Sequence, residues 1–108
     1  MVEYYANFDE IFYSLADGTR RDMLRRLMDV RELTVGELAK NYHLTFAAIS
    51  KHLKVLEKAR LINKRKAGRT QVVSLNPVTL KSVEEYIRQY EALWTKRFDT
   101  LDDVLKGL

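Results

Sequence analysis

A dense group of basic residues occupies one short stretch of this 108-residue chain. Eight Lys and Arg residues lie between Thr45 and Thr70 beside a single acid, Glu57, whereas elsewhere 14 Asp and Glu residues outnumber the other 11 Lys and Arg residues. Lysine and arginine bind phosphate oxygens, and a local positive patch is typical of nucleic-acid binding. The sequence therefore favours contact with a phosphate backbone, and the alternative is a solvated charged surface.

The composition argues against several other kinds of site. The chain has no cysteine, which excludes disulfides, thiolate metal sites and thiol catalysis. His43 and His52 do not have the spacing of a metal site, and no serine has an evident histidine and acid partner. Without a glycine-rich phosphate loop either, we expect neither an enzyme nor a cofactor.

The chain also shows no signal for a membrane. It lacks a cationic start followed by an apolar run, and nowhere are there about 18 consecutive apolar residues. We therefore expect a soluble cytoplasmic protein without a membrane partner.

Apolar periodicity and capping residues predict one domain over residues 1–108. The expected elements are a helix within 1–16, a second helix after Asp17, a short extended link at 32–34, helices from Thr34 to about Tyr42 and from Thr45 to about Ala59, two strands within 61–75, and a long helix over 77–108.

The second helix is expected to bury one apolar face. Leu24, Leu27 and Met28 are assigned to that face. Its arginines are assigned to the other faces, and they are Arg20, Arg21, Arg25 and Arg26.

Two short helices, joined by a tight turn within 34–59, come directly before a basic hairpin. This order is that of a winged helix-turn-helix, so the predicted fold is mainly α with a small β-hairpin wing. At about 100° per residue, Ile49, Leu53 and Leu56 of the fourth helix face inward, and the opposite side faces DNA. The candidate DNA-binding residues of this helix are Thr45, Ala47, Ser50, Lys51, His52 and Lys54.

The individual roles of these residues differ. Lys51 and Lys54 can bind guanine acceptors or phosphates, and Ser50 can bind several base edges. His52 lies on the flank of the inward stripe, where packing or phosphate contact is favoured over base contact.

The predicted wing brings four cations around a turn in which Gly68 can adopt a positive φ. Arg69 at the apex is expected to follow the DNA backbone or to enter the minor groove, and the alternative is a solubilising basic turn. The candidate DNA-binding residues of the wing are Lys64, Arg65, Lys66 and Arg69.

Aromatic residues gather in the first and last helices, away from the basic stretch. The apolar stripe of the last helix is longer than a small head can cover, which favours packing against a second copy and against the first helix. A monomer whose last helix folds back is the alternative, and a small apolar effector could bind between the aromatic rings. The candidate dimer-interface residues are Tyr5, Phe8, Phe12, Val83, Ile87, Tyr90, Trp94, Phe98 and Leu101.

Several motifs together resemble the ArsR/SmtB family of bacterial winged-helix repressors. They are Leu15 to Arg21, Leu38-Ala39, Leu44, Ile49 to Leu53, Leu56, Leu61-Ile62, Arg65 and Gly68-Arg69. The resemblance covers nearly the whole chain. It implies a homodimer that binds an inverted-repeat operator, usually represses, and releases DNA when an effector binds.

The chain departs from the family pattern at several positions. The stretch from Glu32 to Leu38 lacks the two cysteines of metal-sensing members, and the last helix has no histidine, so we expect no transition-metal sensing. Arg60 stands where the family often has glycine. If the helix ends there with a left-handed residue, the arginine would be strained by about 1 kcal/mol. The segment 46–48 is less polar than usual, which leaves fewer hydrogen bonds to bases and more dependence on DNA shape.

Two other functions remain open from the sequence. An architectural protein that binds any duplex would need only the cations, and an adaptor whose winged head binds another protein would need neither cations nor base contacts. A sequence-specific dimeric repressor needs side chains that contact bases.

Overall fold

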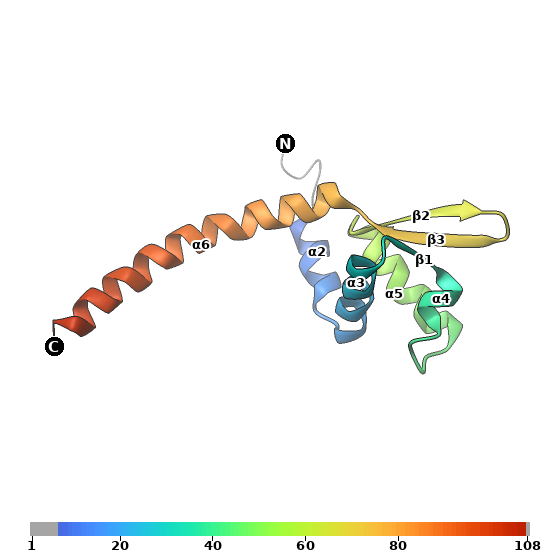
Figure 1. Ribbon diagram of the computed structural model, residues 1–108, viewed down its shortest axis with the longest axis horizontal. Coiled ribbons are helices and arrows are strands. Elements are labelled where there is room, and N and C mark those ends of the chain that lie inside the picture. The colour runs from blue at the N-terminus through green and yellow to red at the C-terminus, as the bar shows by residue number, and fades with distance from the viewer. Residues whose placement is uncertain (1–6, 108) are drawn as a thin grey trace.

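The structure is a computed structural model that describes residues 7–107. Figure 1 shows the helices before the wing and the sheet gathered into a head, from which the last helix projects. The predicted winged helix-turn-helix, mainly α with a small wing, is confirmed. Its elements are α2 (Phe8–Leu15), α3 (Gly18–Asp29), β1 (Glu32–Thr34), α4 (Val35–Ala39), α5 (Phe46–Lys58), β2 (Ile62–Ala67), β3 (Thr70–Leu75) and α6 (Pro77–Lys106).

Helix starts in the head are fixed by side-chain caps. Asp17 Oδ2 accepts from the backbone N–H of Arg20 at 3.0 Å and begins α3. Thr34 and Glu37 form the predicted capping box of α4, with reciprocal bonds of 3.0 and 2.9 Å. These bonds satisfy amides that have no partner inside the helix, so local sequence determines where each helix begins.

The buried face of α3 differs from the predicted one. Met23, Leu24 and Leu27 are buried in the core, whereas Met28 is 61% exposed. Arg20, which the sequence pattern assigns to an outer face, is only 9% exposed. The buried face of α3 is formed by positions 20, 23, 24 and 27. Its first turn is therefore occupied by Arg20.

The three strands form one antiparallel sheet in the order β1-β3-β2. Segment 32–34, predicted only as an extended link, pairs with β3, and Leu33 lies opposite Val73. The hairpin keeps a regular register from Ile62 opposite Leu75 to Ala67 opposite Thr70. The pairing of β1 with β3 therefore connects the segment before the helix-turn-helix to the base of the wing.

Helix α4 is shorter than predicted, because it ends at Ala39 and not near Tyr42. The side-chain amide of Asn41 donates to the backbone oxygens of Glu37 and Leu38, each at 3.3 Å. Asparagine competes in this way with the backbone N–H groups that would continue the helix. The chain therefore turns early, and Tyr42 lies in the connection to α5.

Tyr42 fastens this connection to α3. Its hydroxyl donates to Asp22 Oδ2 at 2.7 Å, and Arg25 and Arg26 donate to the same carboxylate at 2.7 and 2.9 Å. The hydrogen bond from Tyr42, followed by those from the arginines, lowers the pKa of Asp22 far below its usual value of 3.8. Burial and the bond to Asp22 raise the pKa of Tyr42 to about 12.

The first part of α6 packs on α2, and the rest leaves the head. The ring of Tyr86 stacks on Phe8 at 4.4 Å between centroids and lies 5.8 Å from Phe12. Leu80 and Val83 pack against the core. Among residues 7–107 no helix, α6 included, combines the length and apolar character that crossing a bilayer requires.

Replacing Tyr42 by Phe should lower the free energy of unfolding by about 1 kcal/mol at pH 7, because the Asp22 carboxylate loses a donor. The folded-state pKa of Asp22 is lowered, so its contribution is complete well above pH 3.8 and is lost as the pH falls below that value towards the folded pKa. The difference between the two proteins should therefore shrink in acid. Urea unfolding at several pH values measures it, the exposed Tyr13→Phe is the control, and a pH-independent difference would contradict the assignment.

Candidate nucleic-acid interface

Helix α5 presents the outward face that the sequence predicts. Thr45 Oγ1 accepts from the backbone N–H of Ala48 at 3.1 Å and begins the helix. Ile49, Leu53 and Leu56 are at most 1% exposed. The residues of the opposite side are exposed or half-buried, and they are Ala47, Ser50, Lys51 and Lys54. Burial of one face thus leaves a small polar and cationic surface free to contact a ligand.

His52 is half-buried against α3. Its Nδ1 lies 3.3 Å from Arg20 Nη1 and 3.7 Å from Asp17 Oδ2. An arginine guanidinium only donates, so Nδ1 is assigned as the acceptor in this contact. His52 therefore contributes to the packing of the head, and its contact with DNA stays a prediction.

Arg20 joins the end of α2 to α5. Its Nε donates to the backbone oxygen of Ser14 at 2.7 Å and its Nη2 to that of Tyr13 at 3.1 Å. Carbonyls at the end of a helix lack partners within it, and a cation there is favoured by the helix dipole. The buried arginine missed in the sequence is thus a cap for a neighbouring helix.

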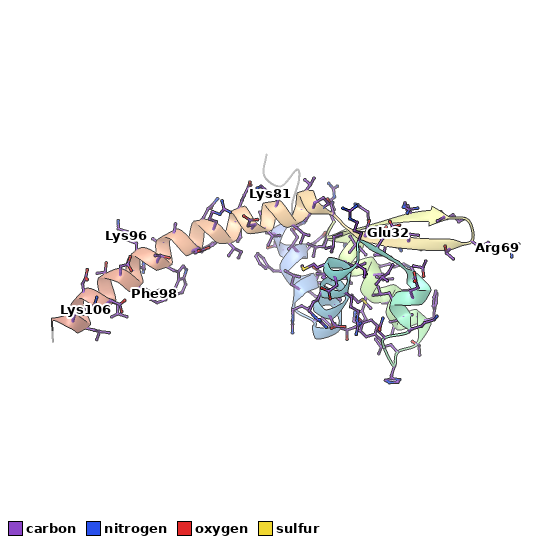
Figure 2. All side chains as sticks on the ribbon, in the orientation of Figure 1. Glu32, Arg69, Lys81, Lys96, Phe98 and Lys106 are labelled. Carbon is purple, nitrogen blue, oxygen red and sulfur yellow. The ribbon has the colours of Figure 1, made fainter. Side chains whose placement is uncertain are left out.

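The wing extends away from the head, with Arg69 at its tip (Figure 2). Gly68 has a φ of 64°, as expected for the turn. Arg65 Nη2 donates to both carboxylate oxygens of Glu32 on β1, each at 3.0 Å. Lys64 lies 3.5 Å from Glu57 of α5, and its side chain is only 20% exposed.

These ion pairs divide the four wing cations into two groups. Lys64 and Arg65 near the base are partly neutralised by acids of the same chain. Within residues 7–107 no carboxylate lies within 4.0 Å of Lys66 or Arg69. The sequence showed all four cations but not the two acids, because both come from other elements. The positive charge available to a phosphate backbone is therefore concentrated at the tip.

The end of α5 contains a left-handed residue at the position where the family often has glycine. Arg60 has a φ of 60°, its N–H donates to the oxygen of Glu57 at 2.9 Å, and Leu61 N donates to that of Leu56 at 3.0 Å. These are the two bonds of a Schellman motif, in which the left-handed position is usually glycine. The turn directs the chain from α5 into β2 and so places the wing beside the helix.

One exposed residue of this surface was not among the predicted contacts. Phe46, the first residue of α5, is 70% exposed. Phe46 lies seven residues before Leu53, so periodicity assigns it to the inward stripe formed by Ile49, Leu53 and Leu56. Its exposure is therefore a feature that the helical pattern of the sequence does not predict.

Comparisons with known proteins agree with this geometry. The family described as "Bacterial regulatory protein, arsR family" matches residues 17–64. The chain is 39% identical over 92 residues to the "HTH-type transcriptional regulator Rv2034" of Mycobacterium tuberculosis, covering 85% of this chain and 82% of that protein. It is 30% identical over 73 residues to the "Transcriptional repressor SdpR" of Bacillus subtilis, covering 68% and 80%.

A solved structure shares the fold. It is described as an "ArsR family transcriptional regulator, RHA00566" and superposes with a TM-score of 0.74 at 33% identity. The superposition covers 82% of this chain and 90% of that one.

Replacing Arg60 by Gly should raise the free energy of unfolding by about 0.5–1 kcal/mol, because glycine adopts the left-handed conformation without steric cost. Thermal unfolding measures the change. Lys54→Gly, at a position inside α5, is the matched control and should destabilise by about 1 kcal/mol. Loss of stability in Arg60→Gly would show that the arginine side chain makes a stabilising contact larger than the backbone strain.

Proposed function

Because this chain belongs to the ArsR family of bacterial transcriptional regulators, we propose that it acts as a homodimeric repressor of an inverted-repeat operator. Its helix-turn-helix is of the DNA-binding type, and its class is that of regulators and not of enzymes. Repression is supported by the similarity to a relative that is named a transcriptional repressor.

The observation that carries the dimer is the apolar face of α6 beyond the head. Large apolar side chains there are 46–59% exposed, namely Ile87, Tyr90, Leu93, Trp94, Phe98, Leu101, Val104 and Leu105. They recur at intervals of three and four residues, which is the pattern of a helix that packs against another helix. Such a long exposed stripe would be unfavourable in water without a partner.

We propose that a second copy of the chain covers this face. Tyr90, Leu93, Trp94 and Arg97 line a hollow of about 280 Å³, which can receive a side chain from a facing helix. Phe8 and Phe12, which stack beside Tyr86 at the root of α6, would extend the same interface. Tyr5, also predicted there, lies outside the described residues.

Two heads related by a dyad would place their α5 helices in successive major grooves, about 34 Å apart. The outward residues of α5 would contact bases, and Lys51 and Lys54 could also bind phosphates. Lys66 and Arg69 would contact the backbone or the adjacent minor groove, since their charge is not neutralised by nearby described acids. Lys64 and Arg65 would contribute less, because Glu57 and Glu32 compete for them.

The regulator we propose works in the cytoplasm, where its DNA lies, and does not sense a transition metal through thiolates, because it has no cysteine. A small apolar effector that binds near the aromatic cluster of α2 and α6 would be in a position to change the angle between the two heads. This cluster includes Phe8, Phe12, Tyr86 and Tyr90.

Selection from a random duplex pool with the purified protein at near-physiological salt tests the proposal. We expect enrichment of an inverted repeat whose half-sites are about one helical turn apart. Transcripts of genes that carry the site should rise when the regulator's gene is deleted, and a fall would indicate activation. Binding without enrichment would indicate an architectural protein, and absence of binding would favour a protein adaptor.

Replacing Trp94 by Glu should separate the dimer, because it places a charge in the middle of the apolar face. The fold should survive, since Trp94 is half exposed and its ring contacts Phe98 of the same helix at 5.8 Å. Analytical ultracentrifugation should show a monomer, and affinity for the inverted repeat should fall at least tenfold, because two linked half-sites bind more tightly than one.

Met28→Glu is the matched control for the Trp94 variant. Met28 is similarly exposed but lies on α3, outside the stripe of α6. This variant should remain dimeric and bind DNA normally. A Trp94→Glu protein that stayed dimeric would show that α6 does not hold the two copies together.

A further inference from the structure

In a helix-turn-helix, the N-terminal end of the second helix enters the major groove of DNA. Phe46 is a large apolar residue at that end of α5. It is the first residue of the helix and is 70% exposed, while Leu44 just before it is 42% exposed. Figure 1 shows this end of α5 next to the turn that follows α4, far from α6. The proposed dimer surface therefore does not account for its exposure.

The fold does not require an aromatic residue at this position. The N-cap bond of α5 comes from Thr45, and the core contacts come from Ile49, Leu53 and Leu56. A ring that is 70% exposed gains little of the free energy that burial in the core would give. Its side chain is therefore available to an external partner.

The position of Phe46 on the helix identifies the surface that it extends. At about 100° per residue, Phe46 lies about 40° from Ser50 of the outward face and about 20° from Leu53 of the inward stripe. It belongs to the first turn of α5, where its side chain is 70% exposed. Phe46 thus stands at the edge of the base-contacting face, at the N-terminal end of the helix.

The major groove offers one apolar group to such a side chain. Every other feature of the base edges there is a hydrogen-bond donor or acceptor, which a phenyl ring would desolvate without compensation, whereas the 5-methyl group of thymine gains from apolar contact. Ala47, exposed beside Phe46, is small enough to let the helix approach the bases. The surface from 46 to 47 is therefore suited to methyl groups and not to polar edges.

We propose that Phe46 is a specificity-determining residue that selects thymine, through its 5-methyl group, at one or two positions of each half-site. Ser50, Lys51 and Lys54 supply the polar contacts to neighbouring positions. This inference rests on the proposed binding of an operator and adds to it the chemical identity of a contacted base.

Thymine and deoxyuridine differ only in this methyl group, which gives a direct test. Each thymine of the selected site is replaced in turn by deoxyuridine in both half-sites, and Kd is measured by fluorescence anisotropy. Loss of a buried methyl should weaken wild-type binding about fourfold per half-site at the contacted position. Changing the same position to cytosine should weaken binding, and 5-methylcytosine should recover part of it.

The Phe46→Ala protein should lose this preference and bind thymine and deoxyuridine sites equally. Phe46→Leu should keep part of it, because leucine is also large and apolar. Arg69→Ala is the matched control, since it should weaken binding to both duplexes while the ratio of their Kd values stays as in the wild type. Urea unfolding establishes that each variant is folded.

The outcomes separate this inference from the function on which it rests. An operator bound with equal wild-type affinity in its thymine and deoxyuridine forms, or a wild-type preference that persists in Phe46→Ala, would overturn the role of Phe46 and leave the regulator intact. A selected half-site without thymine would do the same. Failure of the wild-type protein to bind any duplex would overturn the proposed function and this inference with it.

Discussion

The burial of one face of α5 is the interaction on which the rest of the structure depends. Ile49, Leu53 and Leu56 are enclosed by apolar residues from the other helices and the sheet. Each such side chain stabilises the fold by about 1.5–3 kcal/mol, so the helix has one favourable orientation. The helical period then directs the opposite face outward. Residues on that face contribute little to folding, and their chemistry can follow the requirements of the ligand.

Polar contacts between helices complete this orientation. Arg20 donates to backbone oxygens at the end of α2 and contacts His52 of α5, while Tyr42 bonds Asp22 of α3. The first contact links α5 to the helix on which α6 packs, and the second fixes the turn that leads into α5. These hydrogen bonds are buried or partly buried, where an unpaired polar group would be costly. Removing one partner would therefore leave the other without its hydrogen bond. The recognition helix is thus held at its start, in its middle and along its buried face.

The sequence predicted features that local chemistry determines and missed those that arise from distant partners. The caps of Asp17 and Thr45 and the left-handed Arg60 depend on neighbours within a few residues. The burial of Arg20 could not be predicted, because apolar periodicity assigns an arginine to the surface and its acceptors belong to another helix. The pairing of β1 with β3 and the neutralisation of Arg65 by Glu32 are likewise contacts across long separations.

The proposed division of labour between the head and α6 rests on how few side chains of one head can contact bases. The outward face of α5 offers few hydrogen-bonding side chains beside Phe46 and Ala47, and a good base contact discriminates by only about 1–3 kcal/mol. In the dimer that we propose, a second head held at a fixed distance would add its contacts without a further bimolecular cost. The distal part of α6 exposes an apolar stripe outside the core of its own head, and association with a second copy would cover this stripe. The length of this one helix would then compensate for the small size of the interface that each chain brings to DNA.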